Sequence, residues 1–101
     1  MVVGIATFEL HIPSSRSLKD KRRVVKALIE RLHHRYRLSI VESDYHDLHQ
    51  RAEIGLAAVA ASGGELERML EEVRGIVDQV PEAYLTRWDP QILEEAGASG
   101  R

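Results

Sequence analysis

Residues 51–80 read RAEIGLAAVAASGGELERMLEEVRGIVDQV, and this stretch decides the fold. Its first part, over residues 51–61, is rich in small and apolar side chains and predicts a strand. Ser62, Gly63 and Gly64 break that pattern, and apolar residues then recur every three or four positions, which is the spacing of one helix face. The apolar positions are Leu66, Met69, Leu70, Val73, Ile76, Val77 and Val80, opposite Glu65, Glu67, Glu71, Glu72 and Asp78. A strand followed directly by an amphipathic helix indicates a layered α/β chain.

The chain before residue 51 predicts a strand, a helix and a second strand. Apolar residues occupy both faces from Val3 to Leu10, as in the middle of a sheet, and Pro13 ends the strand. Ser17 suits the N-cap of a helix over about residues 18–36. A short strand over 38–41 then pairs as a hairpin with the strand over 51–61, through a connection at 44–48.

After Pro81 the sequence predicts one more strand, over residues 83–88, before Asp89 and Pro90. The order β-α-β-β-α-β with right-handed crossovers predicts an α+β, ferredoxin-like sandwich. It would have a four-stranded antiparallel sheet, with the first and third strands central and two helices on one face. We expect a single domain over residues 1–90 and a flexible C-terminal tail over 91–101, in which a helical turn at 91–96 could dock against a sheet edge.

Composition excludes several classes of protein. The 101 residues are 44% hydrophobic and 30% charged, which suits one modest core. The chain has no cysteine, which excludes a disulfide framework, a thiolate metal site and a cysteine nucleophile. Residues 1–12 contain Glu9 and His11 and lack a basic leader, so they predict a strand instead of a targeting or membrane segment. We expect a cytoplasmic protein that does not contact a membrane.

Charge is unevenly distributed along the chain. Residues 14–37 hold nine Lys and Arg against Asp20 and Glu30, a net charge of +7, whereas the whole chain has a net charge of −2. Helical spacing places several of these cations on the solvent side of the first helix, and such a stripe matches the backbone of a nucleic acid. The candidate anion-binding residues are Ser17, Lys19, Lys21, Arg22, Arg23 and Lys26, and His33 and Arg37 extend the stripe. The alternative is a solvated helix face with ion pairs such as Lys26 with Glu30.

Ionisable side chains also crowd residues 42–51, ESDYHDLHQR. Asp44, His46, Asp47 and His49 could converge on a divalent metal, but their spacing matches no established ligand pattern. We favour a polar loop in which Asp47 caps a turn and pairs with Arg51, and predict no metal and no cofactor. The candidate residues that support the neighbouring site are Glu42, Asp47, Gln50 and Arg51.

Common enzyme signatures are absent from the sequence. It has no glycine-rich phosphate loop, no G-x-S-x-G elbow and no H-E-x-x-H pair. Arg16 invites comparison with acylphosphatases, which share the element order, but their glycine-rich loop is missing. An RNA-recognition motif is also unlike this chain, because the strand over 51–61 carries no aromatic residue for stacking on bases.

The predicted sheet leaves one face without helices. If Phe8, Leu10 and Ile54 face the helices, Val3, Ile5, Ala57 and Val59 lie on the opposite face. Exposed apolar residues of this kind favour association, and a homodimer is the commonest form. The alternative is a sparsely apolar face diluted by Thr7, Glu9, Arg51 and Glu53.

The motifs Ser17-Leu18-Lys19-Asp20-Lys21-Arg22, Glu42, Asp47-Leu48 and Gln50-Arg51 resemble the small bacterial YlxP-like family of domains of unknown function. The resemblance covers about residues 1–90 and departs at His49, where relatives often carry Trp. It implies a ferredoxin-like fold and no known catalytic activity. The family's genes tend to neighbour those for translation and ribosome-maturation factors, which implies a role near RNA.

We therefore predict a non-enzymatic protein that binds RNA or a ribonucleoprotein through the basic first helix. Two alternatives remain open. The first is a homodimeric scaffolding or regulatory domain that uses the bare sheet face. The second is a phosphate-ligand binder or small enzyme centred on Arg16, Ser17 and Lys19, with acids or histidines from residues 44–49.

Overall fold

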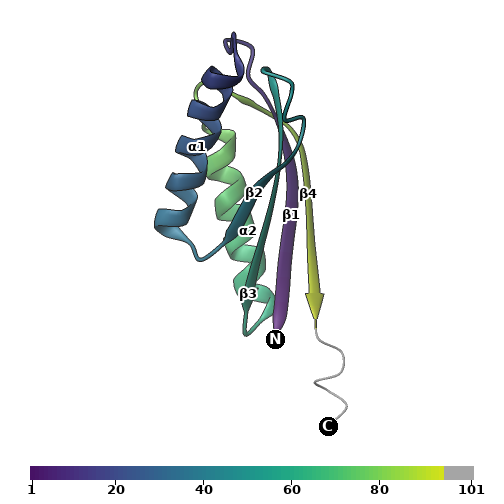
Figure 1. Ribbon diagram of the computed structural model, residues 1–101. Coiled ribbons are helices and arrows are strands. Elements are labelled where there is room, and N and C mark those ends of the chain that lie inside the picture. The colour runs from purple at the N-terminus through teal and green to yellow at the C-terminus, as the bar shows by residue number, and fades with distance from the viewer. Residues whose placement is uncertain (95–101) are drawn as a thin grey trace.

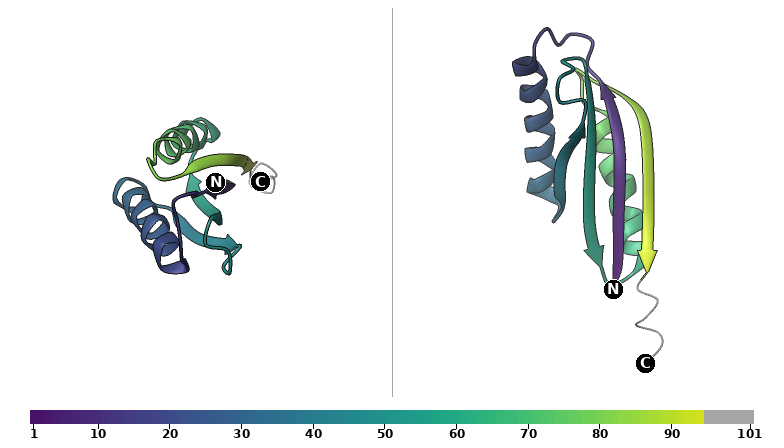
Figure 2. Two further views of the ribbon diagram at one scale, coloured as in Figure 1. Left: turned by 90° about the horizontal axis from the view of Figure 1, so that it is seen from above. Right: turned by 45° about the vertical axis from the view of Figure 1, so that its right-hand side comes forward.

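This computed structural model describes residues 1–94, which form four strands and two helices (Figure 1). In chain order the elements are β1 (Val2–His11), α1 (Leu18–Arg35), β2 (Ser39–Asp44), β3 (Arg51–Ala60), α2 (Gly63–Asp78) and β4 (Tyr84–Glu94). The strands make one antiparallel sheet in the order β2-β3-β1-β4. Both helices lie against the same face of the sheet (Figure 2). The predicted ferredoxin-like sandwich, with the first and third strands central, is confirmed.

The two faces of the sheet follow from the alternation along β1. Ala6, Phe8 and Leu10 point toward the helices and are buried, whereas Val3 and Ile5 point the other way and keep partial exposure. The outward positions continue across the sheet, because Val3 lies opposite Val59 in β3 and Leu93 in β4. The predicted division of faces is therefore correct, and no described element covers the outward face.

The core forms where the two helices meet the inward face. Each helix buries one stripe of apolar side chains, as its sequence spacing predicts. In α1 the stripe is Val24, Val25, Leu28 and Leu32, and in α2 it is Leu66, Leu70, Val73, Ile76 and Val77. Phe8 is fully buried beneath them, and its ring centroid lies 5.5 Å from that of Trp88 in β4.

The side chain of Leu66 in α2 approaches the backbone of β1 closely at Gly4. A Cβ atom at this position would lie 3.1 Å from Cδ2 of Leu66, which is fully buried. Gly4 therefore lets the first turn of α2 rest directly on the central strand.

The last strand extends beyond its predicted end. We expected a strand over 83–88, a domain boundary at residue 90 and a tail or helical turn from residue 91, but β4 continues to Glu94. Ile92 pairs with Gly4, and Glu94 pairs with Val2. Pro90 does not end the strand, because β4 is an edge strand and one side of an edge needs no donor for the sheet. The remainder of the expected tail, residues 95–101, lies outside the described residues.

Other element boundaries shift by a few residues. Ser62 is the N-cap of α2, and its Oγ accepts a hydrogen bond from the Glu65 backbone N–H at 3.3 Å, so Gly63 and Gly64 belong to the first turn. The second strand runs from Ser39 to Asp44, and both Leu38 before it and Ile40 within it pack against the core. Over residues 1–94 neither helix has the length and hydropathy needed to cross a membrane.

Candidate nucleic-acid interface

The start of α1 is held by two reciprocal contacts. Ser17 Oγ accepts a hydrogen bond from the Asp20 backbone N–H at 3.0 Å, so the predicted N-cap is correct. Asp20 Oδ2 in turn accepts a hydrogen bond from the backbone N–H of Arg16 at 2.9 Å. The carboxylate of Asp20 also interacts favourably with the positive end of the helix dipole. These contacts order the turn that carries the first cations of the helix.

Four of the predicted cations lie on the solvent side of α1: Lys19, Arg22, Arg23 and Lys26. Arg23 pairs with Glu82 at 2.9 Å, and Lys26 lies 4.0 Å from Glu30. Both cationic side chains stay largely exposed, at 65% and 78%, so water screens these pairs and an external anion can compete for them. Lys19 and Arg22 form no ion pair within the described part of the chain.

Lys21 does not belong to this surface. Its side chain is 1% exposed, and Nζ donates hydrogen bonds to the backbone oxygens of Tyr45 at 2.7 Å and Arg51 at 3.1 Å. Nζ also forms an ion pair with Glu42 Oε2 at 2.8 Å, and this buried oxygen accepts no hydrogen bond of good geometry from the described residues. The prediction that Lys21 contacts a bound anion is therefore wrong, because the ammonium faces the β2–β3 hairpin.

The loop between β2 and β3 lies beside the start of α1. Gln50 Nε2 donates hydrogen bonds to the backbone oxygens of Pro13 at 3.0 Å and Ser15 at 3.2 Å. The Ile12 backbone N–H donates to the Gln50 oxygen at 2.9 Å. The predicted supporting residues Glu42, through Lys21, and Gln50, through the residues before α1, thus connect the hairpin to the start of the helix.

Asp47 and Arg51 do not pair as expected. Asp47 is exposed, and within the described residues no hydrogen bond or ion pair joins it to Arg51. The turn closes instead through the Leu48 backbone N–H, which donates to the Tyr45 oxygen at 3.0 Å. Tyr45 adopts a φ of 62°, in the left-handed region, and this directs its ring over the open face of the sheet toward Glu9.

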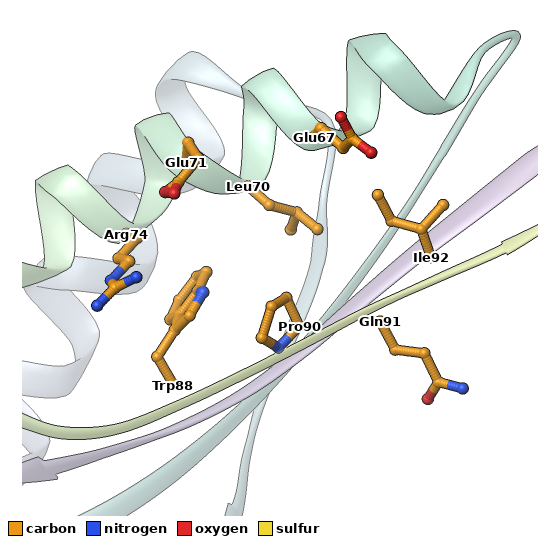
Figure 3. A pocket seen from close by; sticks show the side chains of 8 residues that line it. All are labelled: Glu67, Leu70, Glu71, Arg74, Trp88, Pro90, Gln91 and Ile92. Atoms are coloured by element: carbon orange, nitrogen blue, oxygen red, sulfur yellow. The ribbon is translucent and has the colours of Figure 1, made fainter.

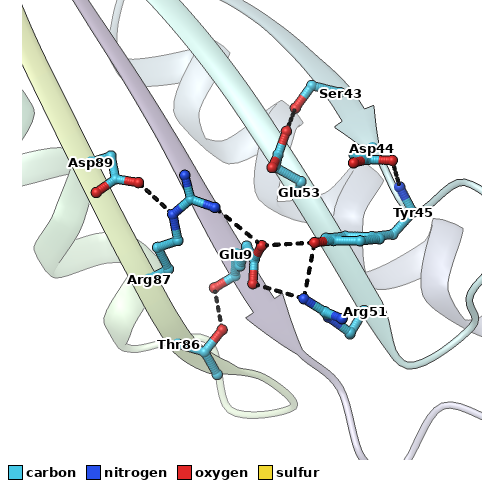
Figure 4. A network of polar contacts seen from close by, with 9 residues as sticks. All are labelled: Glu9, Ser43, Asp44, Tyr45, Arg51, Glu53, Thr86, Arg87 and Asp89. Carbon is cyan, nitrogen blue, oxygen red and sulfur yellow. Dashed lines mark hydrogen bonds and ion pairs between the residues drawn. The ribbon is translucent and has the colours of Figure 1, made fainter.

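Glu9 is the centre of a polar network on that face (Figure 4). Its side chain is 12% exposed and accepts hydrogen bonds from the Tyr45 hydroxyl at 3.1 Å, Arg51 at 3.2 Å and Arg87 at 3.4 Å. Arg87 also donates to Asp89. The Arg51 guanidinium lies 4.0 Å from the centroid of the Tyr45 ring, in a cation–π contact. The network joins β1, β3, β4 and the loop between β2 and β3.

The network changes the pKa of its members. The hydrogen bond to Glu9 raises the pKa of Tyr45 above its ordinary value of 10.0, and partial desolvation adds to this. A hydrogen bond to the same carboxylate raises the pKa of Arg51, and Asp89 raises the pKa of Arg87. All three groups therefore keep their neutral-pH protonation states, and none of the three is ready to transfer a proton.

Sequence reasoning missed this network. The alternation along β1 places Glu9 on the outward face, but the sequence does not show that Tyr45 and Arg87 reach it from two other elements. One signal in the sequence could have indicated the network. Glu9 is a carboxylate within a largely apolar central strand, and a carboxylate in such a place needs hydrogen-bonding or charged partners.

The alternative metal site has no geometric support in the described residues. Over residues 1–94 no three His, Asp or Glu side chains are placed to hold a metal ion. Asp44 Oδ1 accepts the Tyr45 backbone N–H at 2.7 Å, and His46 Nε2 lies 2.9 Å from the Glu42 backbone oxygen. Two of the four candidate ligands are therefore engaged within the loop itself.

The two-layer arrangement places the chain in the ferredoxin-like class of α+β proteins. Its structure is similar to the designed protein Foldit4, with a TM-score of 0.55 and 8% identity over 94% of this chain and 99% of that one. It is also similar to protein Atu4242 from Agrobacterium tumefaciens, with a TM-score of 0.53 and 13% identity over 95% and 94% of the two chains. At these identities the likeness shows the fold alone.

Sequence comparison shows the family. Residues 3–89 match the family described as "Protein of unknown function (DUF503)", and this chain belongs to that family. Uncharacterized protein YlxP of Bacillus subtilis (strain 168) is 37% identical over 85 residues, which cover 84% of this chain and 92% of that protein. The resemblance seen in the motifs is therefore confirmed.

Proposed function

We propose that this protein binds RNA, alone or within a ribonucleoprotein, through the exposed basic face of α1, and that it acts in translation or ribosome maturation without catalysing a reaction. The observation that carries the proposal is the set of exposed cations at Lys19, Arg22, Arg23 and Lys26 along one helix face. A row of separate cations matches a row of phosphates better than it matches one small anion. The cations are exposed, so binding would release counterions and weaken with salt.

The neighbouring loop supports the same proposal. Gln50 connects the β2–β3 hairpin to the residues that precede α1, so the loop and the helix start form a continuous surface. His49 is exposed in this loop and would contact sugar or base edges beside the phosphates. The buried Lys21 holds the loop in place and makes no contact with RNA.

Binding to a fluorescent structured RNA across a salt series tests the proposal. Replacing Arg22 and Lys26 by Gln should weaken binding about tenfold and lower the salt slope by roughly 0.7–0.9 for each phosphate that the variant no longer neutralises. The matched control, Arg68→Gln with Arg74→Gln, removes the same charge from α2 and should leave the affinity unchanged. Equal RNA affinity in the two double variants would overturn the proposal.

A homodimer is the second candidate, favoured by the open sheet face. Val41, Val59 and Leu93 on this face are 61%, 63% and 46% exposed, and Val3 lies between Val59 and Leu93. The other end of the face carries both signs of charge, with Glu9, Arg51 and Arg87. A two-fold axis could therefore match the face with itself. The partner in this proposal is a second copy of the chain.

Sedimentation tests the homodimer directly. The wild-type protein should sediment as a dimer at micromolar concentration, and Val59→Lys should shift it to a monomer without changing its thermal stability greatly. Because apolar contacts dominate the proposed interface, the dimer should persist in high salt. A monomeric wild-type protein would remove this candidate.

A further inference from the structure

A groove lies between α2 and the edge strand β4, and the residues that line it come from these two elements (Figure 3). Its volume is about 590 Å³, within the range of sites that hold ligands or peptide side chains. Leu70 comes from the helix, and Trp88, Pro90 and Ile92 come from the strand. Neither the proposed RNA interface nor the proposed dimer face includes this groove.

The floor of the groove is apolar, and its side chains pack against the hydrophobic core. Leu70 is buried, and Trp88 packs its ring against Phe8 in the core. Ile92 also contacts the core and remains partly exposed in the groove. The side chains of Trp88 and Ile92 point from β4 toward α2, whereas Gln91 points away from the groove (Figure 3). The groove is therefore a preformed apolar surface.

The helix side of the groove carries two carboxylates and one guanidinium. Glu67 and Glu71 are exposed and lie one helical turn apart, where two like charges destabilise a helix. Arg74 follows at the end of the groove, but none of these three side chains forms an ion pair within the part of the chain that the structure describes. The two carboxylates are therefore available to a cationic partner.

We propose that this groove docks a short amphipathic helix of a partner protein, with apolar side chains on one face flanked by Lys or Arg. The apolar side chains would contact Trp88, Pro90 and Ile92, and the cations would meet Glu67 and Glu71. The stretch from Glu67 to Arg74 spans roughly two helical turns, which matches a helix with anchors at i, i+3 or i+4, and i+7.

A helical partner fits better than an added strand. Strand addition needs an unbroken row of backbone donors and acceptors along the edge of β4. Pro90 has no backbone N–H, so it interrupts that row within the groove. Side-chain contacts from a helix do not depend on this edge.

Trp88 is the only tryptophan of the chain, so its fluorescence reports on the groove without a label. The probe is a synthetic peptide with Leu and Lys at helical spacing. We expect a saturable change in the emission of Trp88, and no saturable change with a peptide of the same spacing that carries Glu in place of Lys. Absence of a saturable change with the Lys peptide, or equal binding of both peptides, would overturn the proposal.

Variants separate specific docking from general attraction to an acidic protein. Replacing Glu67 and Glu71 by Gln should weaken peptide binding about tenfold, and it should not unfold the helix because it removes a repulsive pair. The control, Glu65→Gln with Asp78→Asn, removes the same charge from α2 outside the groove and should bind normally. Equal affinity in both double variants would overturn the proposal. The variant in which Gln replaces Arg22 and Lys26 should still bind the peptide. Failure of the peptide proposal can therefore be distinguished from failure of the RNA proposal.

Discussion

Lys21 Nζ lies 2.8 Å from Glu42 Oε2 and connects the first turns of α1 to the edge strand β2. The ammonium is almost fully buried, the carboxylate is 19% exposed, and two backbone oxygens complete the shell of the ammonium. A buried ammonium with three partners strongly constrains the position of the segments that carry those partners. Moving any of them away would leave a buried polar group without a partner, which costs free energy. This one side chain therefore fixes where the β2–β3 loop lies relative to the helix.

Lys21→Met should lower the free energy of unfolding by about 2–4 kcal/mol, because it leaves the Glu42 carboxylate and two carbonyls without their partner. Urea unfolding followed by circular dichroism measures the change. The Lys21→Met, Glu42→Gln double variant should recover part of the loss, since it removes the unpaired charge. Lys19→Met, at an exposed site, should stay within about 0.5 kcal/mol of wild type. A Lys21→Met loss as small as that of Lys19→Met would contradict a structural role.

Glu9→Gln should destabilise the protein by about 1–2 kcal/mol, because the charged acceptor of Tyr45, Arg51 and Arg87 becomes neutral. The two arginines are about half exposed, and water replaces part of what they lose. Chemical denaturation gives the comparison, with Glu30→Gln as a control on the exposed face of α1. Equal stabilities of the Glu9 and Glu30 variants would show that the network contributes nothing to stability.

Tyr45 should make stability fall at alkaline pH. Its pKa is raised in the folded protein, chiefly by the hydrogen bond to Glu9, so folding favours the protonated phenol. This contribution is fully present below the ordinary pKa of 10.0 and is lost as pH rises through the higher folded pKa. Phenolate absorbance during a pH titration of wild type and Tyr45→Phe gives the difference curve for this residue. Its midpoint should lie above 10.0, and a midpoint at or below that value would contradict the network geometry.

Gly4→Ala should destabilise the protein by about 1–3 kcal/mol, because the new methyl group would lie 3.1 Å from Cδ2 of the fully buried Leu66, closer than an ordinary van der Waals contact. Gly75→Ala is the matched control, since a Cβ at position 75 in α2 meets nothing within 4 Å. That variant should stabilise the helix by up to about 1 kcal/mol. Thermal unfolding of the two alanine variants should thus shift in opposite directions, and shifts of the same sign would argue against the close approach at Gly4.

Local patterns were enough to predict the elements and their order. The alternation of β1, the stripes of α1 and α2 and the cap at Ser17 depend on neighbours in sequence, so short-range geometry determines them. The end of β4 was predicted too early, because whether Pro90 ends a strand depends on its place at the sheet edge.

The candidate site was harder to predict from the sequence than the fold was. Lys19 and Lys21 stand two positions apart in one cationic run, yet one is exposed and the other is buried. Helical spacing places Lys21 on the side of α1 that faces the sheet. Its ammonium can be buried there only because Glu42 and two backbone carbonyls of a hairpin distant in sequence bind it. The partners of Glu9 are equally distant in sequence, and no local pattern pairs it with Tyr45 and Arg87.

The sequence by itself determined the ferredoxin-like architecture, the central position of β1 and β3, and the concentration of positive charge in α1. These properties follow from hydrophobic periodicity and from the composition of one segment. Only the tertiary structure decided which cations remain at the surface, how the β2–β3 loop meets the helix start, and where an apolar groove opens beside Trp88. Those features depend on contacts between residues far apart in the chain. A charged side chain such as Lys21 can be buried without a large loss of free energy only where the fold brings charged or polar partners to it.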